Sequence, residues 1–103
     1  MKKGYQLTFY TLQSRQHNGG YISDWLEEIA QEAGVNGITV TNSAKGLGHD
    51  GTWHSASFFE LIDQPLEIIM IADEKACTKI FALLEAQKSN LFYTKTAIEY
   101  GTI

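Results

Sequence analysis

The stretch from Gly34 to Asp63, GVNGITVTNSAKGLGHDGTWHSASFFELID, predicts two strands joined by a glycine-rich loop. On the incoming side, Ile38 and Val40 alternate with threonines, which is the period-two pattern of a half-buried strand. On the outgoing side, residues 56–62 carry apolar groups on both faces and predict a strand covered on both sides. Between them lie three glycines, Gly46, Gly48 and Gly51. Because glycine allows close approach of a neighbour or ligand, we expect function at this loop.

Three further segments predict strands. Tyr5–Leu12 alternates in polarity and is rich in β-branched and aromatic side chains. Leu66–Ala72 has apolar residues on both of its faces, so we expect a well-buried strand. Leu91–Thr96 predicts the last main strand, and residues 97–103 predict an edge strand or a tail that lies on a neighbouring subunit.

Two segments have apolar residues at helical spacing. The first, Ile22–Ala33, is followed by Gly34, where a left-handed C-terminal cap is expected. The second begins after the capping residue Asp73 and ends near Gln87. Cys77 lies on the apolar stripe of this second helix with no histidine beside it in sequence. We therefore interpret Cys77 as a small core residue and not as a nucleophile.

The connecting segments consist of turn-forming residues. Gln13–Gly20 contains no apolar residue and predicts a surface loop, on which we expect His17 to be solvated. Asp63-Gln64-Pro65 is expected to interrupt the strand pattern, because proline has no backbone N–H for a sheet. Lys88-Ser89-Asn90 is expected to turn the chain into its last strand.

The resulting order of strand, helix, strand, strand, helix, strand predicts the α+β, ferredoxin-like split βαβ fold. This fold has an antiparallel sheet with two helices on one face, and we expect residues 1–103 to form a single domain because no linker or repeat interrupts them. The other face of the sheet is left bare. Contiguous apolar faces of this kind mark interaction sites, so we expect a homo-oligomer.

The composition disfavours several classes of partner. The 103 residues have a formal net charge of −4, and the eight lysines and arginines are scattered, which is a poor electrostatic match for nucleic acid. There is no apolar run of membrane-spanning length and no secretory leader pattern, so we expect neither membrane insertion nor export. A single cysteine cannot form an internal disulfide, and we expect a cytoplasmic protein.

One group of residues has the chemistry of a metal site. His49, Asp50 and His54 are all potential ligands for a divalent cation and lie close together in sequence. The alternative is that Asp50-Gly51 forms a tight turn and the histidines are surface groups. The acidic pairs Glu27-Glu28 and Asp73-Glu74 are helix neighbours, which do not converge on one substrate, so we expect no catalytic residues and no enzyme activity.

Two motifs resemble those of a known family. GVNGITVTNSAKGLG is followed by a loop that contains glycine and histidine, and then by FFELIDQPLEIIMIADEKACTKIFALL. This order and spacing resembles the PII signalling proteins, and it is most similar to their relatives in the domain of unknown function 190 family, in which a histidine precedes the third strand as His54 does here. The resemblance covers nearly the whole chain.

The resemblance implies a trimer with a ligand site between subunits and a loop, here residues 43–55, that contacts a partner protein. The implied ligand is an adenine nucleotide or another small anion, and the implied partner is a membrane transporter or an enzyme. Carried across to this chain, the ligand site uses Gly37, Thr39, Gly46, Gly48 and His54. The partner would contact Lys45, Leu47, Asp50 and Trp53.

The chain departs from the PII pattern before the last strand. There, PII proteins that bind ATP have Gly-Asp-Gly-Lys, whereas this chain has Gln87-Lys88-Ser89-Asn90. Two other functions are open at this point. One is a metal-binding sensor that uses the histidines of the loop. The other is a small ferredoxin-like, cofactor-independent enzyme with Trp53 and His54 facing an apolar pocket.

Overall fold

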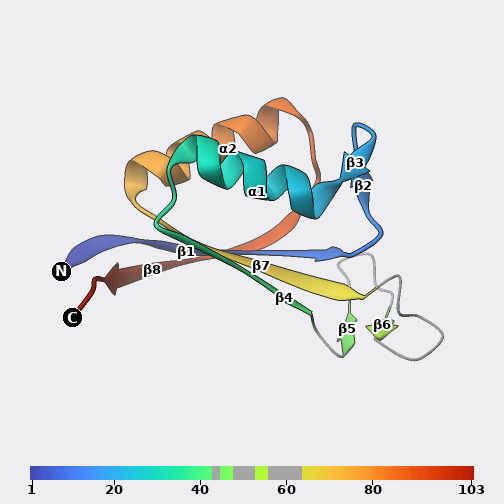
Figure 1. The fold of residues 1–103 in the computed structure, drawn as a ribbon, viewed down its shortest axis with the longest axis horizontal. Helices are drawn as coiled ribbons and strands as arrows, with labels where there is room; N and C mark the ends of the chain where they lie inside the picture. The colour runs from blue at the N-terminus through green and yellow to red at the C-terminus, as the bar shows by residue number, and fades with distance from the viewer. Residues whose placement is uncertain (43–44, 48–52, 56–63) are drawn as a thin grey trace.

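The computed structural model describes residues 1–42, 45–47, 53–55 and 64–103, and the side chains of 1–42 and 64–103. The elements are, in chain order, β1 (Lys2–Leu12), β2 (Gln16–His17), β3 (Gly20–Tyr21), α1 (Ile22–Ala33), β4 (Gly37–Asn42), β5 (Lys45–Leu47), β6 (Trp53–Ser55), β7 (Pro65–Ala72), α2 (Glu74–Ala86) and β8 (Phe92–Tyr100). Figure 1 shows both helices on one side of the main sheet, so the α+β, ferredoxin-like arrangement is confirmed.

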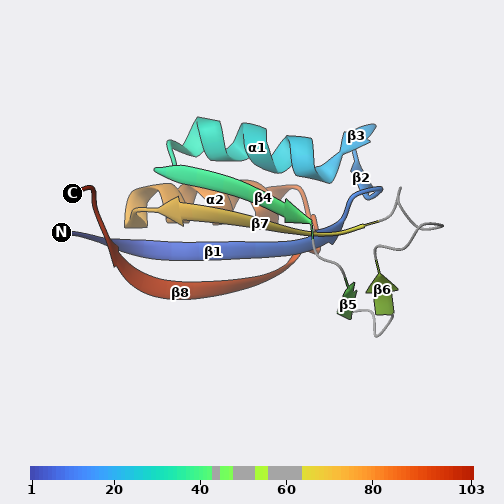
Figure 2. The same ribbon diagram turned by 60° about the horizontal axis from the view of Figure 1, so that its bottom comes forward.

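The main sheet has the strand order β4-β7-β1-β8, and every neighbouring pair is antiparallel. Figure 2 shows the four strands side by side in this order beneath the helices. The register places Phe9 of β1 opposite Ile68 of β7 on one side and opposite Tyr93 of β8 on the other. Since residues that pair across strands share a face, this register assigns each side chain of the sheet to the helix side or to the open side.

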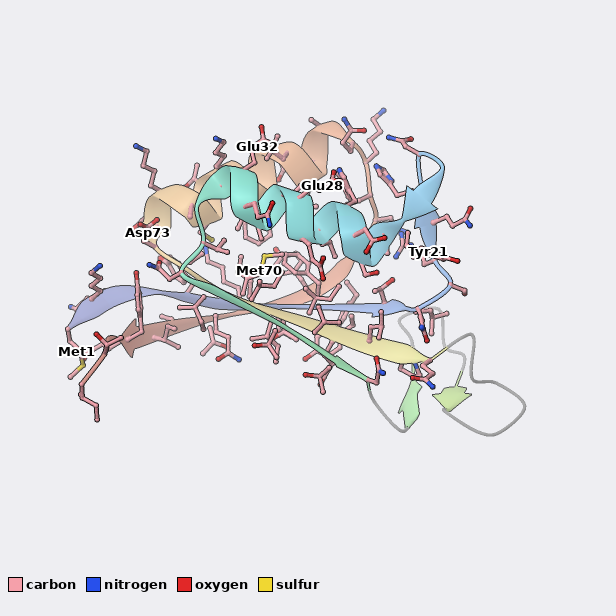
Figure 3. The ribbon with its side chains drawn as sticks, in the orientation of Figure 1. Met1, Tyr21, Glu28, Glu32, Met70 and Asp73 are labelled. Atoms are coloured by element: carbon pink, nitrogen blue, oxygen red, sulfur yellow. The ribbon has the colours of Figure 1, made fainter. Side chains whose placement is uncertain are left out.

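The core lies between the sheet and the two helices. Leu7 and Phe9 of β1 and Ile68 and Met70 of β7 are completely buried on the helix side. The helices contribute a matching set of buried residues, which includes Leu26, Ile29, Ile80 and Leu84. Figure 3 shows Met70 between the sheet and the helices, with Glu28 and Glu32 on α1. Burial of each large apolar side chain contributes about 1.5–3 kcal/mol to folding.

Both helices follow the sequence prediction closely. α1 spans the predicted residues, and Gly34 caps it in the left-handed conformation (φ 76°, ψ 43°), with its N–H donating to the carbonyl oxygen of Ala30. The carboxylate of Asp73 caps α2 by accepting a 2.8 Å hydrogen bond from the N–H of Ala76. The predictions for these two helix ends are therefore confirmed.

The strands differ from the prediction at their ends. β8 continues to Tyr100 as an edge strand that pairs with β1 along most of its length, so residues 97–100 are not a separate tail. Pro65 is the first residue of β7 and pairs with Leu12, which is a position where a strand tolerates proline. The strand predicted at 56–62 lies outside the described residues.

Two segments predicted as loops contain short hairpins. Within Gln13–Gly20, β2 pairs with β3 across a turn in which Asn18 and Gly19 have positive φ angles of 50° and 84°. Such a turn matches the twist of antiparallel strands, which explains why this polar segment forms a ladder. Within residues 43–55, β5 pairs with β6.

His17 is half-buried, so the expectation of a solvated side chain was wrong. Its ring stacks on Trp25 with 4.0 Å between ring centroids and an interplanar angle of 25°. Its Nε2 lies 3.3 Å from Nδ2 of Asn18. The stack attaches the β2–β3 hairpin to the first turn of α1, which has no side-chain cap of its own.

Neither helix of the described ranges is long and apolar enough to cross a membrane.

Candidate functional site

The elements that carry the predicted site meet at one end of the main sheet. At this end β1 stops at Leu12, β4 stops at Asn42, β7 begins at Pro65 and β8 begins at Phe92. The β5–β6 hairpin, the β2–β3 hairpin and the turn between α2 and β8 (residues 87–91) all adjoin it (Figure 1). We call it the hairpin end of the sheet. Residues from four separate parts of the chain are thereby brought to one place.

Gly37 and Thr39 lie on the open face of the sheet. The register pairs Gly37 with Ile71 and Thr39 with Ile69, and these two isoleucines are half-buried on the side away from the helices. A Cβ added at Gly37 would meet no atom within 4 Å, so the fold of one chain does not require glycine at this position. The two residues share a face, and Gly37 lies about 16 Å along the strand from Asn42.

The hairpin brings two of the other predicted ligand residues opposite each other. Gly46 of β5 pairs with His54 of β6. The proposed partner-contact residues Lys45 and Leu47 pair with Ser55 and Trp53, in that order. Gly48, His49 and Asp50 lie outside the described residues. The metal-site hypothesis falls on these residues, and no group of three potential metal ligands occurs in the part of the chain that the structure describes.

The α2–β8 turn is part of this end of the sheet, and the sequence reasoning did not include it in the site. Lys88 and Asn90 have positive φ angles of 50° and 52°, and both side chains are exposed. Ser89 between them is buried, with 8% of its surface exposed. For a non-glycine residue the left-handed conformation costs about 1–2 kcal/mol, less for asparagine. Two such residues in one turn therefore require stabilising contacts elsewhere.

Arg15 supplies a stabilising contact for this turn. Its guanidinium donates hydrogen bonds to the carbonyl oxygens of Ser89 and Asn90, the second at 3.3 Å. Asn18 adds a bond from Nδ2 to Oε1 of Gln87 at 3.3 Å. A signal for this contact was present in the sequence, because Arg15 is the single arginine of the chain. Its partners are 74 and 75 residues away, so no local pattern could have identified them.

Aromatic side chains line the β8 side of the hairpin end. Phe92 is 48% exposed on the open face, and its ring centroid lies 5.7 Å from that of Tyr10. On the helix side, Tyr93 packs against Phe81 with 4.9 Å between centroids. The edge strand thus exposes large apolar groups on both of its faces near the turn.

The described residues also form a cavity of about 400 Å³, at the other end of the sheet. It is lined by Lys3, Gly4, Tyr5, Glu74, Ala97, Ile98 and Glu99. None of the residues predicted for the ligand site lines this cavity. Its charged side chains are exposed and of mixed sign, which gives no basis for recognition of a particular ligand. We therefore place the candidate site at the hairpin end.

Cys77 lacks the environment of a catalytic thiolate. It is 3% exposed, and burial raises the pKa of its thiol, an effect that nearby Glu74 adds to and nearby Lys95 opposes. The ammonium of Lys95 itself lies 4.2 Å from the ring centroid of Tyr5. A buried thiol with a raised pKa is unreactive, so Cys77 is a core residue as predicted.

Solved structures with the same fold belong to PII-like proteins. CPII, a nitrogen regulatory PII-like protein from Thiomonas intermedia K12 bound to ADP, AMP and bicarbonate, superposes with a TM-score of 0.65 and 15% identity, over 93% of this chain and 88% of that one. A protein from Thermus thermophilus described as PII-like signaling superposes with a TM-score of 0.61 and 16% identity, over 95% and 89%. At such identities the likeness shows the fold alone.

These likenesses define the class as PII-like, which agrees with the sequence resemblance. The sequence itself matches a family model over residues 4–100, and the description of that family is "Uncharacterized ACR, COG1993". The chain belongs to this family, DUF190. A comparison with curated protein sequences gives no match.

Proposed function

We propose that this protein is a PII-like regulatory protein that binds a small ligand without converting it. It assembles as a homotrimer and takes an adenine nucleotide, with a small anion, in the cleft between neighbouring copies. It signals through residues 43–55 to a partner protein, a membrane transporter or an enzyme. The observation that carries the proposal is that the β5–β6 hairpin and the α2–β8 turn adjoin the same end of the sheet on opposite edges.

The two edges suggest how the cleft forms. The hairpin follows β4, which is one edge strand, and the turn precedes β8, which is the other. In a closed ring of copies, each copy uses one edge to meet the opposite edge of the next. The hairpin of one copy would then lie beside the α2–β8 turn of its neighbour. Each subunit contact would form one cleft, with Gly46 and His54 from one copy and Lys88 from the other.

The open face of the sheet supports the assembly. Ile69 and Ile71 lie at its centre and are only half-buried in the single chain, and Phe92 is 48% exposed at its edge. Both helices lie on the opposite face and cannot cover these side chains (Figure 2). Apolar groups that are continuous across several strands are normally covered by another subunit, since their exposure is unfavourable.

The chemistry of the site supports a nucleotide ligand and regulation without turnover. Lys88 offers a cation, and Thr39 offers a hydroxyl on the open face, both suited to a phosphorylated and hydroxylated ligand. CPII, which has the same fold, was solved with ADP, AMP and bicarbonate and also with acetate. Among the described residues, the only resolved pKa shift is that of the core residue Cys77, so none of them has the shifted pKa typical of an acid or base in catalysis.

The proposal is tested by mass and by binding. Light scattering on the purified protein should give the mass of three chains. Isothermal titration with AMP and with ADP, each with and without bicarbonate, should show saturable binding, and the melting temperature should rise with ligand concentration by mass action. A monomer that responds to none of these ligands would contradict the proposal.

The location of the cleft is tested by mixing subunits. One subunit type carries Gly46→Val in the hairpin, and the other carries Lys88→Glu in the turn. Each homotrimer should bind poorly. In a mixed trimer, the intact hairpin of one type meets the intact turn of the other at one contact, so binding should return. Mixed trimers that stay as weak as the parents would show that hairpin and turn of the same copy form the site.

A further inference from the structure

Arg15 lies in the tight connection between β1 and β2 and is held there by its own backbone. Its N–H donates to the carbonyl oxygen of Leu12 at 3.1 Å, and its carbonyl oxygen accepts from the N–H of Ile22 at 2.9 Å. The side chain is half-buried and crosses to the α2–β8 turn. The backbone of Arg15 is thereby tied both to the end of β1 and to the first residue of α1.

The contact of Arg15 fixes the direction of two peptide groups. The guanidinium accepts no hydrogen bond and donates to the carbonyl oxygens of Ser89 and Asn90. In a planar trans peptide the carbonyl and the following N–H point in opposite directions. The N–H groups of Asn90 and Leu91 therefore point away from Arg15 and in a common direction. Successive N–H groups oriented in this way form an anion-binding arrangement.

The β2–β3 hairpin keeps Arg15 in place. The His17 ring stacks on Trp25 of α1, and Asn18 bonds to the side chain of Gln87 at the end of α2. Residues 15–18 therefore connect the first turn of α1 with the turn that enters β8. Because they join these two elements, the direction of the Ser89 and Asn90 carbonyl groups is set by contacts outside the turn itself.

We infer that Arg15 is a positioning residue for the ligand cleft: it holds the α2–β8 turn so that the N–H groups of Asn90 and Leu91, beside Lys88, face an anionic group of the ligand. This inference rests on the proposed function for the identity of the ligand. A lysine at position 15 could not replace the arginine fully, because one ammonium lacks the planar fork that reaches two carbonyl oxygens at once.

The inference is tested with Arg15→Gln and Arg15→Lys. A matched control is Lys79→Met, which removes another bond from a cationic side chain to a carbonyl oxygen, that of Lys79 Nζ to Glu32 at 3.1 Å between the helices. AMP and ADP binding is measured by titration, and amide hydrogen exchange at Asn90 and Leu91 is measured without ligand. Circular dichroism verifies that each variant is folded.

Arg15→Gln should bind AMP or ADP about tenfold more weakly, the loss expected for hydrogen bonds from a charged group. Its exchange at Asn90 and Leu91 should be faster, Arg15→Lys should lie between it and the unmutated protein, and Lys79→Met should change neither readout. Unchanged binding in Arg15→Gln, or an equal loss in Lys79→Met, would overturn the inference. If the unmutated protein binds neither nucleotide, the proposed function fails, and unchanged exchange in Arg15→Gln would separately show that Arg15 does not order the turn.

Discussion

The ring of Tyr100 lies against the backbone of Gly4, so that a Cβ added at Gly4 would be 2.9 Å from Cε1 of Tyr100. The same Cβ would be 2.5 Å from the carbonyl oxygen of Ala72. The hydroxyl of Tyr100 donates to Oδ1 of Asn36 at 3.0 Å, and Asn36 directly precedes β4. A side chain from one edge strand thus reaches the start of the other edge strand, at the end of the sheet opposite the hairpin.

Gly4→Ala should destabilise the protein by about 1–3 kcal/mol, because the new methyl group forces the Ala72 backbone or the Tyr100 ring to move. Urea unfolding followed by circular dichroism measures the change. Gly20→Ala is the control, since a Cβ there meets no atom within 4 Å. Equal stability of the two variants would mean that the packing of Tyr100 on Gly4 has no energetic weight.

Gly37→Val should leave the fold of the chain intact and impair ligand binding or assembly. A Cβ at Gly37 meets nothing in the single chain, and valine suits a strand, so only a ligand or a second copy can oppose the larger side chain. Titration with AMP and light scattering measure the effect. Gly101→Ala, also in open space, should alter neither property. Normal binding and normal mass for Gly37→Val would remove Gly37 from the site.

Asp73→Ala should destabilise the protein by about 1 kcal/mol, because the N–H of Ala76 loses its acceptor and the first turn of α2 loses a favourable charge. Thermal unfolding checks the size of the effect. Asp73→Asn, which keeps a capping oxygen, should lose less. If Asn and Ala at this position are equivalent and both harmless, the cap contributes nothing measurable.

Lys88→Gly should stabilise the protein by about 1 kcal/mol while weakening AMP binding, since glycine adopts the left-handed conformation without strain but has no charge. Chemical unfolding and titration measure the two effects. Lys88→Asn, which also tolerates this conformation, should weaken binding similarly with a smaller gain in stability. A loss of stability in Lys88→Gly would show that the lysine side chain is held by contacts that outweigh its backbone strain.

Stability should fall with rising pH through the titration of Cys77. Burial raises the pKa of this thiol above its ordinary value of 9.0, so the unfolded chain releases the proton at a lower pH than the folded protein does. The contribution is therefore fully present below pH 9 and is lost as the pH rises from there through the pKa of the folded state. Cys77→Ala should lose less stability than the unmutated protein between about pH 8 and pH 10, measured by urea unfolding. Parallel curves would contradict this.

The helices were predictable from sequence because their determinants are local. The apolar stripe of α1, its cap at Gly34 and the cap of α2 at Asp73 each involve residues within about one turn of one another. The extension of β8 to Tyr100 was not predictable in this way. Most side chains of β8 are exposed, so its hydrophobic pattern is weak, and β1 supplies the backbone hydrogen bonds that keep it extended.

The candidate site was predictable only in part, for the same physical reason. The glycines and threonines of the β4 region form a contiguous motif, whereas the bond of Arg15 to Ser89 joins segments far apart in sequence. The hairpin at residues 16–21 could have been predicted, because Asn18-Gly19 is a strong signal for a two-residue hairpin turn. The absence of apolar residues in Gln13–Gly20 concealed it.

The central position of β1 has a consequence for how the chain folds as it is synthesised. β1 is made first, but its two neighbours in the sheet are β7 and β8, and the pairing of Lys2 with Tyr100 brings the two chain ends side by side (Figure 1). Until the second half of the chain has left the ribosome, Leu7 and Phe9 have no partner strand. Contacts between such distant residues slow folding, and the waiting strand is exposed to aggregation. Chaperones that shield apolar segments would therefore act on the first residues of this protein rather than on its last.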